Sequence, residues 1–138
     1  MPQALLEEVF YSTNYYTQRA VTIIQNYSRA LQHQRAGGVA AAKALWVHLA
    51  HQAVHAPITD VPEWEACPER NKFWDPVYAD MLHVLDSSLA NVTAALQDAG
   101  LWEQTLLIAL SDNGGVGTQG NNFPRWRYIV HAQRKPSK

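Results

Sequence analysis

Apolar residues recur at helical spacing in the first third of the chain. Either Ser12 or Thr13 is suited to cap a helix there, and the periodic pattern then continues to about Arg35. The pair Gly37-Gly38 follows and is expected to end this helix. Its predicted apolar face consists of Tyr16, Ala20, Ile23, Tyr27 and Leu31.

A second and longer apolar stripe predicts another helix from about Asp75 to Ala99. Gly100 follows it and is a suitable terminator. A continuous stripe of this kind indicates core packing rather than a cofactor site. The stripe consists of Tyr78, Met81, Leu82, Leu85, Leu89, Val92 and Leu96.

Two shorter stretches, residues 44–50 and 106–111, are almost continuously apolar. Such runs are typical of strands buried on both faces in a parallel sheet. Residues 56–73 contain three prolines and are predicted to form a loop. The order helix, strand, loop, helix, strand fits one right-handed β-α-β crossover preceded by a helix. Two strands do not make a stable parallel sheet, so we expect an incomplete α/β fold, with mostly parallel strands and flanking helices.

Charged residues are distributed unevenly along the 138 residues of the chain. Residues 1–124 hold six Lys or Arg and twelve Asp or Glu, whereas residues 125–138 hold five basic residues and no acidic one, which gives a net charge of −1. Five positive charges do not make a nucleic-acid surface, so we expect no nucleic-acid partner. Cys67 is the only cysteine, which excludes an internal disulfide. No apolar stretch reaches the roughly 18 residues of a membrane span, and the first residues do not resemble a secretory signal.

The tetrapeptide Asp112–Gly115 follows the second apolar run directly. In open α/β sheets, ligand sites lie where strands end at their carboxyl side. A carboxylate and an amide oxygen, followed by two glycines that let the backbone approach closely, suit a hard cation such as calcium. The same residues also suit a simple turn, because Asn-Gly is a strong hairpin signal.

Three histidines surround the end of the first apolar run, at positions 48, 51 and 55. His55 lies just past its carboxyl end, so we expect it to share a crevice with Asp112 and Asn113. On a helix, the three imidazoles would share a face and could bind zinc. The predicted strand separates them, and Pro57 opposes a helix that continues past His55.

Several blocks together resemble the sulfatase family, in particular arylsulfatase B-like enzymes. Residues 49–57 are similar to the "LAxQAVHxP" block of arylsulfatases, and the resemblance extends from about Val9 to Pro124. We therefore expect residues 1–124 to be part of a sulfatase catalytic domain and residues 125–138 to be a divergent basic tail. The other similar blocks are Tyr11–Thr13 with Thr17, Arg19 and Ala20; Tyr78–Met81 with Asp86 and Asn91–Leu96; Gly100–Trp102; Ser111–Gly115; and Gly120–Pro124.

The resemblance implies an alkaline-phosphatase-like fold that hydrolyses sulfate esters of aryl groups or glycans. In the family, a cysteine or serine in a C-x-P-S/A-R motif is oxidised to formylglycine, whose hydrate is the nucleophile. One calcium ion is held by two early aspartates and a later Asp-Asn pair, which Asp112 and Asn113 match. His55 matches the histidine that contacts the sulfate. The family is lysosomal or secreted, a compartment in which the sequons at Asn26 and Asn91 would accept glycans.

The chain also departs from the family pattern. It contains no C-x-P-S/A-R motif, and the sequence around Cys67 lacks the required spacing, so we assign no nucleophile. The two early aspartates and the basic residues around the nucleophile are absent as well, which leaves a partial calcium ligand set. We therefore expect this chain to be inactive alone. The alternative is a non-catalytic, truncated paralogue that binds a metal, a sulfated ligand or a partner.

Overall fold

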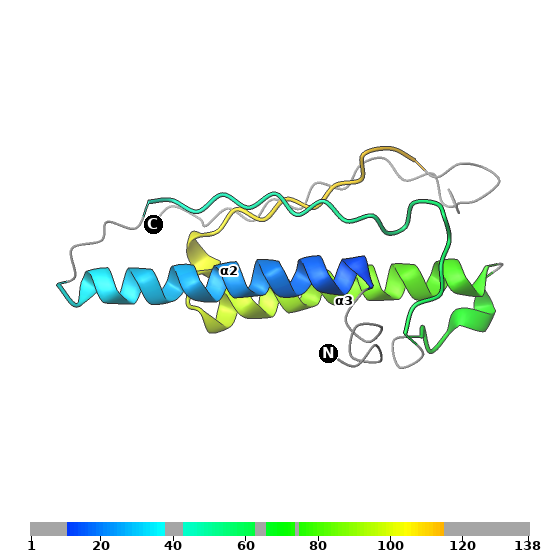
Figure 1. Ribbon diagram of the computed structural model, residues 1–138, viewed down its shortest axis with the longest axis horizontal. Helices are drawn as coiled ribbons and strands as arrows, with labels where there is room; N and C mark the ends of the chain where they lie inside the picture. The colour runs from blue at the N-terminus through cyan, green and yellow to red at the C-terminus, as the bar shows by residue number, and fades with distance from the viewer. Residues whose placement is uncertain (1–10, 38–42, 63–65, 74, 115–138) are drawn as a thin grey trace, which may run out of the picture.

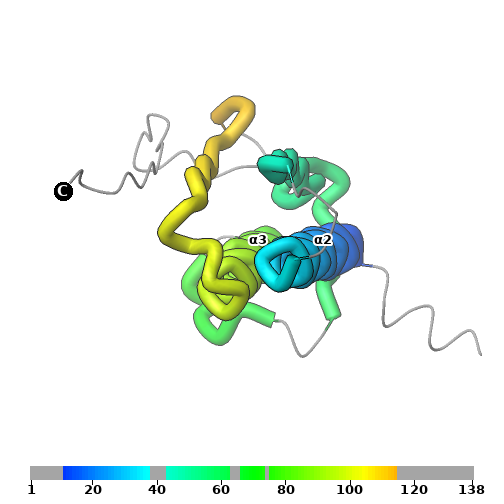
Figure 2. Tube along the Cα trace, turned by 90° about the vertical axis from the view of Figure 1, so that its left-hand side faces the viewer, coloured from blue at the N-terminus to red at the C-terminus, as the bar shows by residue number. Residues whose placement is uncertain are grey.

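The computed structural model describes residues 11–37, 43–62, 66–73 and 75–114. Two long helices dominate them: α2 spans Ser12–Arg35 and α3 spans Pro76–Asp98. Two short 3₁₀ helices, η2 (Arg70–Lys72) and η3 (Trp102–Gln104), flank α3. Figures 1 and 2 show α2 and α3 packed along each other, both running in the same direction.

Two hydrogen bonds between the helices fix their register. Thr17 Oγ1 lies 2.6 Å from Ser88 Oγ, and Ser28 Oγ donates to the Ala99 carbonyl at 3.2 Å. Both pairs are separated by 71 positions in the chain, as expected of parallel helices in constant register. Polar contacts therefore join the two helices at two points along their length.

Helix α2 begins and ends where the sequence predicts, but its cap and its buried face differ. Tyr11 is the N-cap and makes no side-chain cap bond, so the prediction of a Ser12 or Thr13 cap is wrong. Gly37, at φ 90°, follows the C-cap Ala36 and ends the helix as predicted. Small residues let the helices approach closely, and they displace the predicted tyrosines from the interface. The buried residues of α2 are Thr13, Thr17, Ala20, Ile24 and Ser28.

Helix α3 confirms its predicted range because strong local signals mark both ends. The Asp75 carboxylate accepts hydrogen bonds from the backbone N–H groups of Val77 and Tyr78, at 3.0 and 3.1 Å, and proline occupies the first helical position. Gly100, at φ 66°, follows the C-cap Ala99. The predicted stripe is only partly buried: Met81, Val92 and Leu96 are inside, whereas Leu82 and Leu89 are exposed.

The main hydrophobic core lies between the two helices. Its buried members are Ala20, Ile24, Val92, Ala95 and Leu96. Leu49 from the extended segment and residues 101 and 102 from the end of α3 pack against this cluster. The proline-rich residues 56–62 and 66–69 form a loop as predicted. A search of the described helices for a candidate transmembrane span finds none.

The two predicted strands are not formed in the described part of the chain. Residues 44–50 and 105–111 are extended but belong to no strand, and no described backbone hydrogen bond joins them. Many of their apolar side chains face solvent, and Trp46 is 87% exposed. A parallel pair needs further strands and cover on both faces, which these two segments do not supply for each other. The prediction of an α/β fold is therefore not confirmed, and the described residues are helical.

The two extended segments nevertheless share one orientation. Both lie on one side of the helix pair and run in the same direction, opposite to the helices (Figures 1 and 2). Their carboxyl ends lie toward the end of the molecule where α3 begins (Figure 1). The predicted tail, residues 125–138, lies outside the described residues.

Candidate functional site

His55 lies in a turn at the end of the first extended segment. Its backbone N–H donates to the Gln52 carbonyl at 2.7 Å, and its side chain is exposed. The ring Nδ1 lies 2.7 Å from the Ala56 carbonyl oxygen. A carbonyl only accepts, so Nδ1 must carry the proton of this bond. The contact leaves Nε2 to accept a proton when the ring is neutral and to donate one when it is charged.

Asp112 and Asn113 form an exposed turn after the second extended segment. The Asn113 backbone N–H donates to Asp112 Oδ1 at 2.9 Å, and the Asn113 side-chain amide donates to the Gly114 carbonyl at 2.8 Å. Within the described residues, Asp112 Oδ2 and Asn113 Oδ1 accept no hydrogen bond. Two hard oxygen donors therefore remain available for a cation, whereas calcium takes six to eight ligands.

The structure brings His55 and Asp112 to the same end of the molecule but not into contact. The segments that carry them end toward the start of α3 (Figure 1), yet no described contact joins the imidazole to either donor. Among the described residues, no group of three or more His, Cys, Asp or Glu is placed to hold a metal ion. That finding covers the three histidines too: His48 and His55 are exposed, whereas His51 contacts Ser88.

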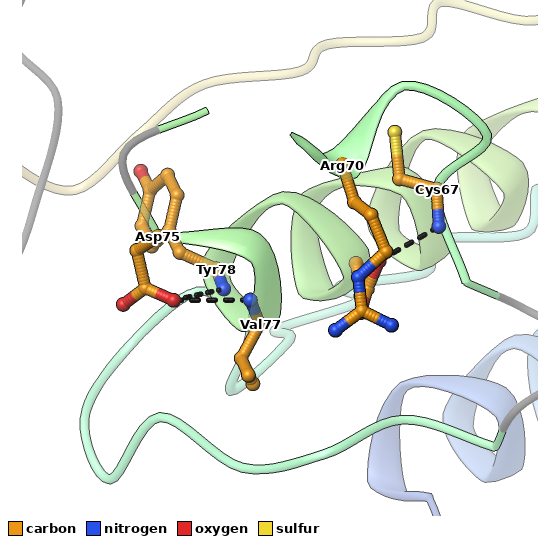
Figure 3. A network of polar contacts seen from close by, with 6 residues as sticks. Cys67, Arg70, Asp75, Val77 and Tyr78 are labelled. Atoms are coloured by element: carbon orange, nitrogen blue, oxygen red, sulfur yellow. Dashed lines mark hydrogen bonds and ion pairs between the residues drawn. The ribbon is translucent and has the colours of Figure 1, made fainter. Parts of the chain in front are cut away.

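A buried carboxylate at Asp80 is the strongest polar feature that the sequence patterns did not reveal. The Cys67 backbone N–H donates to Asp80 Oδ1 at 2.7 Å, and Arg70 Nη2 lies 3.0 Å from Asp80 Oδ2. Figure 3 shows Cys67 and Arg70 in this network, which fastens the loop before η2 onto α3. Its contacts hold the Cys67 region against α3.

Replacing Arg70 with alanine is expected to lower the free energy of unfolding by about 2 kcal/mol. The Asp80 side chain is 4% exposed, so the variant leaves a buried carboxylate without its cation. The loss is below the full cost of breaking a buried pair because the Arg70 side chain is 38% exposed. Urea unfolding followed by circular dichroism measures it.

The neighbouring ion pair supplies a matched control for this experiment. Lys72 Nζ lies 2.6 Å from Glu69 Oε1, but both side chains are well exposed. Lys72→Ala should therefore change the free energy of unfolding by no more than about 0.5 kcal/mol. Equal losses in Arg70→Ala and Lys72→Ala would show that burial of Asp80 does not determine the effect.

A second polar chain crosses the helix pair from the extended segment. His51 Nε2 lies 3.0 Å from Ser88 Oγ, which lies 2.6 Å from Thr17 Oγ1. Burial lowers the pKa of His51 below its ordinary value of 6.5. The position of His51 just after an apolar run gave no sign of this contact, because the contact depends on packing between segments distant in sequence.

The two sequons lie on the surface of the helices. Asn26 on α2 and Asn91 on α3 are both exposed. Their side chains are therefore accessible in the folded chain, which is compatible with the predicted glycosylation.

Comparison with known proteins covers almost the whole chain. The family model described as Sulfatase matches residues 6–133. Arylsulfatase J of Mus musculus is 33% identical over 119 residues, which are 83% of this chain and 17% of that protein. The chain thus spans about a sixth of the length of this curated relative. No solved structure matches it significantly.

Proposed function

The chain belongs to the sulfatase family, and from this premise we propose that it forms part of the sulfate-ester site of a calcium-dependent, arylsulfatase-like hydrolase. Its contributions would be His55 and the pair Asp112 and Asn113. One observation supports this most directly. The two extended segments run in the same direction, and both end toward the end of the molecule where α3 begins (Figure 1). That is the placement that a site at the carboxyl ends of parallel strands requires.

The proposed roles follow from the atoms that remain available. His55 Nε2 would contact the sulfate of an aryl or glycan ester and, when charged, donate a proton to the leaving oxygen. Asp112 Oδ2 and Asn113 Oδ1 are a carboxylate and an amide oxygen, the donor types that a hard cation prefers. Calcium, when bound, would offset the repulsion between a nucleophile and the sulfate oxygens.

The 138 residues alone are not expected to turn over a sulfate ester. They contain no C-x-P-S/A-R motif, and residues elsewhere would have to supply the nucleophile and the other calcium ligands. Two measurements test the proposal: hydrolysis of 4-nitrophenyl sulfate by this chain, and by the product of the longest transcript that contains it. We expect no turnover from the first and calcium-dependent turnover from the second. A long transcript without the motif, whose product is inert, would contradict the proposal.

Calcium alone is expected to leave the stability of this chain unchanged. Two oxygen donors are far from a complete shell, so the ion should bind weakly and give no rise in Tm at low-millimolar calcium. Differential scanning calorimetry with and without calcium checks this. A clear rise in Tm that Asp112→Ala abolishes would show instead that this chain forms a calcium site by itself.

A second candidate function is binding of a metal, a sulfated ligand or a partner without catalysis. Retention of the chain on immobilised sulfated glycan, lost in His55→Ala, together with an inert long-transcript product, would favour it over the hydrolase.

The lysosomal or secreted location of the proposed enzyme is also a proposal. Exposure of Asn26 and Asn91 supports it, since both sequons would be reachable in that pathway. Protein isolated from its native source should lose mass on treatment with an N-glycosidase. Unmodified asparagine at both positions would count against this location.

A further inference from the structure

His51 is the histidine through which the extended segment 43–55 contacts the helix pair. Its Nε2 lies 3.0 Å from the buried Ser88 Oγ of α3. Ser88 Oγ lies 2.6 Å from Oγ1 of the buried Thr17, which lies 2.6 Å from the Thr13 carbonyl oxygen on α2. Two residues before His51, Leu49 packs against the hydrophobic core between the helices. Segment 43–55 is thus held at one polar and one apolar point, two residues apart.

Counting protons along this chain shows which form of His51 it accommodates. Each hydroxyl has one hydrogen, so Thr17 donates either to the Thr13 carbonyl or to Ser88. With a neutral ring protonated at Nε2, Thr17 donates to the Thr13 carbonyl, and Ser88 donates to Thr17 and accepts from Nε2, so every N–H and O–H of the chain has an acceptor. His51 Nδ1 is enclosed and has no hydrogen-bond partner in the described part of the structure. The imidazolium has a proton on both nitrogens and needs two acceptors, but only Nε2 has one.

Within the part of the chain that the structure describes, no charged group contacts His51 to compensate for an imidazolium. The side chains that reach His51 directly or through Ser88 are uncharged hydroxyls. The ionisable side chains of the surrounding turns are exposed and make no described contact with the ring: Arg19 of α2, Asp86 of α3, His48 and His55 of its own segment, and Asp112 of the other extended segment. Burial alone, which lowers the pKa of His51, therefore acts on the ring.

We propose that neutral His51 latches segment 43–55 onto the helix pair and that protonation of its imidazole releases the segment in mildly acidic solution. A charged ring with an unpaired Nδ1–H is more stable in water than beside Ser88, so it leaves the interface and takes Leu49 with it. The direction of the pH effect follows from the pKa of His51 in the folded state, which lies below 6.5. The latch is complete above pH 6.5 and is lost as the pH falls through that lower value.

Release would change the position of everything that segment 43–55 carries, His55 included. The latch would therefore make one edge of the molecule sensitive to the acidity of its surroundings. This inference rests on the contacts of His51 and does not depend on the proposed sulfatase activity.

Solution NMR of the 138-residue chain between pH 8 and pH 4.5 tests the latch. The ring Cε1–H shift of His51 reports its protonation, and NOEs from the Leu49 methyl groups to the core report the attachment of the segment. We expect these NOEs at pH 7.5, and we expect them to disappear together with the protonation of His51. Circular dichroism should show that both helices persist, which separates release from global unfolding.

Two variants isolate the role of the ring. His51→Gln keeps a group that can hydrogen-bond to Ser88 but does not titrate, so its Leu49 NOEs should persist to pH 4.5. His48→Gln removes an exposed histidine of the same segment and should behave like the parent chain. The latch is refuted if the NOEs are absent at pH 7.5, if they survive protonation of His51, or if His51→Gln loses them at the same pH as the parent. It is refuted too if His51 stays neutral with its contacts intact down to pH 4.5.

Discussion

Replacing Ile24 with alanine is expected to lower the free energy of unfolding by about 3 kcal/mol. Ile24 is 3% exposed and lies in the core formed with Val92 and Leu96 of α3. The variant removes three buried carbons and leaves a cavity that two packed helices cannot readily close. Because small domains are stable by only about 5–15 kcal/mol, this loss should be visible as a large shift in the urea midpoint.

The adjacent residue is a matched control for this variant. Ile23 has the same side chain on the same helix but is 38% exposed. Ile23→Ala should cost less than about 1 kcal/mol, because a partly exposed side chain loses less transfer free energy and leaves no cavity. The sequence pattern places Ile23 on the apolar face, whereas the structure buries Ile24. A greater loss in Ile23→Ala than in Ile24→Ala would favour the pattern over the observed packing.

Helix boundaries are predictable in this chain because their causes are local. Asp75 and Pro76 start α3 through a cap bond and a fixed φ, and Gly37 and Gly100 end the helices at positive φ. The face that each helix buries is not local. Helix α2 packs through Thr17, Ala20 and small neighbours because their size suits close approach to α3, and a periodicity of apolar residues alone does not reveal that partner.

The two predicted strands do not form in the described residues, and the cause is again a contact that is not local. An apolar run such as residues 106–111 indicates that the segment is buried in the fold. A strand forms only where the backbone of another segment pairs with it through hydrogen bonds. In the described residues the segment stays extended with Leu106 facing solvent, and no ladder forms. Both extended segments run in the same direction (Figure 1), but without strands the predicted α/β fold is not confirmed in the described residues.

The candidate site likewise has residues that the sequence indicates and polar contacts that it does not. The ends of the apolar runs and the resemblance both single out His55, Asp112 and Asn113, and their role as one site stays a prediction. The polar groups that do contact one another, at Asp80 and His51, were not anticipated. A carboxylate or an imidazole gains its importance there from burial against a distant segment, and residue spacing contains no record of that burial.

His55→Ala is expected to lower kcat for aryl sulfate hydrolysis at least about 100-fold in the product of the longest transcript that contains this chain. Positioned general acids contribute roughly 10²–10⁴-fold, which sets the size of the loss. The Nδ1–H bond to the Ala56 carbonyl prepares Nε2 for this role, because it fixes the tautomer before substrate arrives. KM should change less than kcat, since proton donation to the leaving oxygen matters most in the transition state.

A leaving-group series and a neighbouring histidine separate catalysis from structure. Loss of the proton donor should be most severe for an alkyl or glycan sulfate and mildest for 4-nitrophenyl sulfate, whose leaving oxygen needs little help. A merely structural loss would reduce both equally. His48→Ala removes an exposed imidazole from the same extended segment and should leave kcat within about twofold, as is typical of surface substitutions. If His48→Ala matched His55→Ala, or if His55→Ala retained full activity on the glycan sulfate, His55 would not be the proton donor.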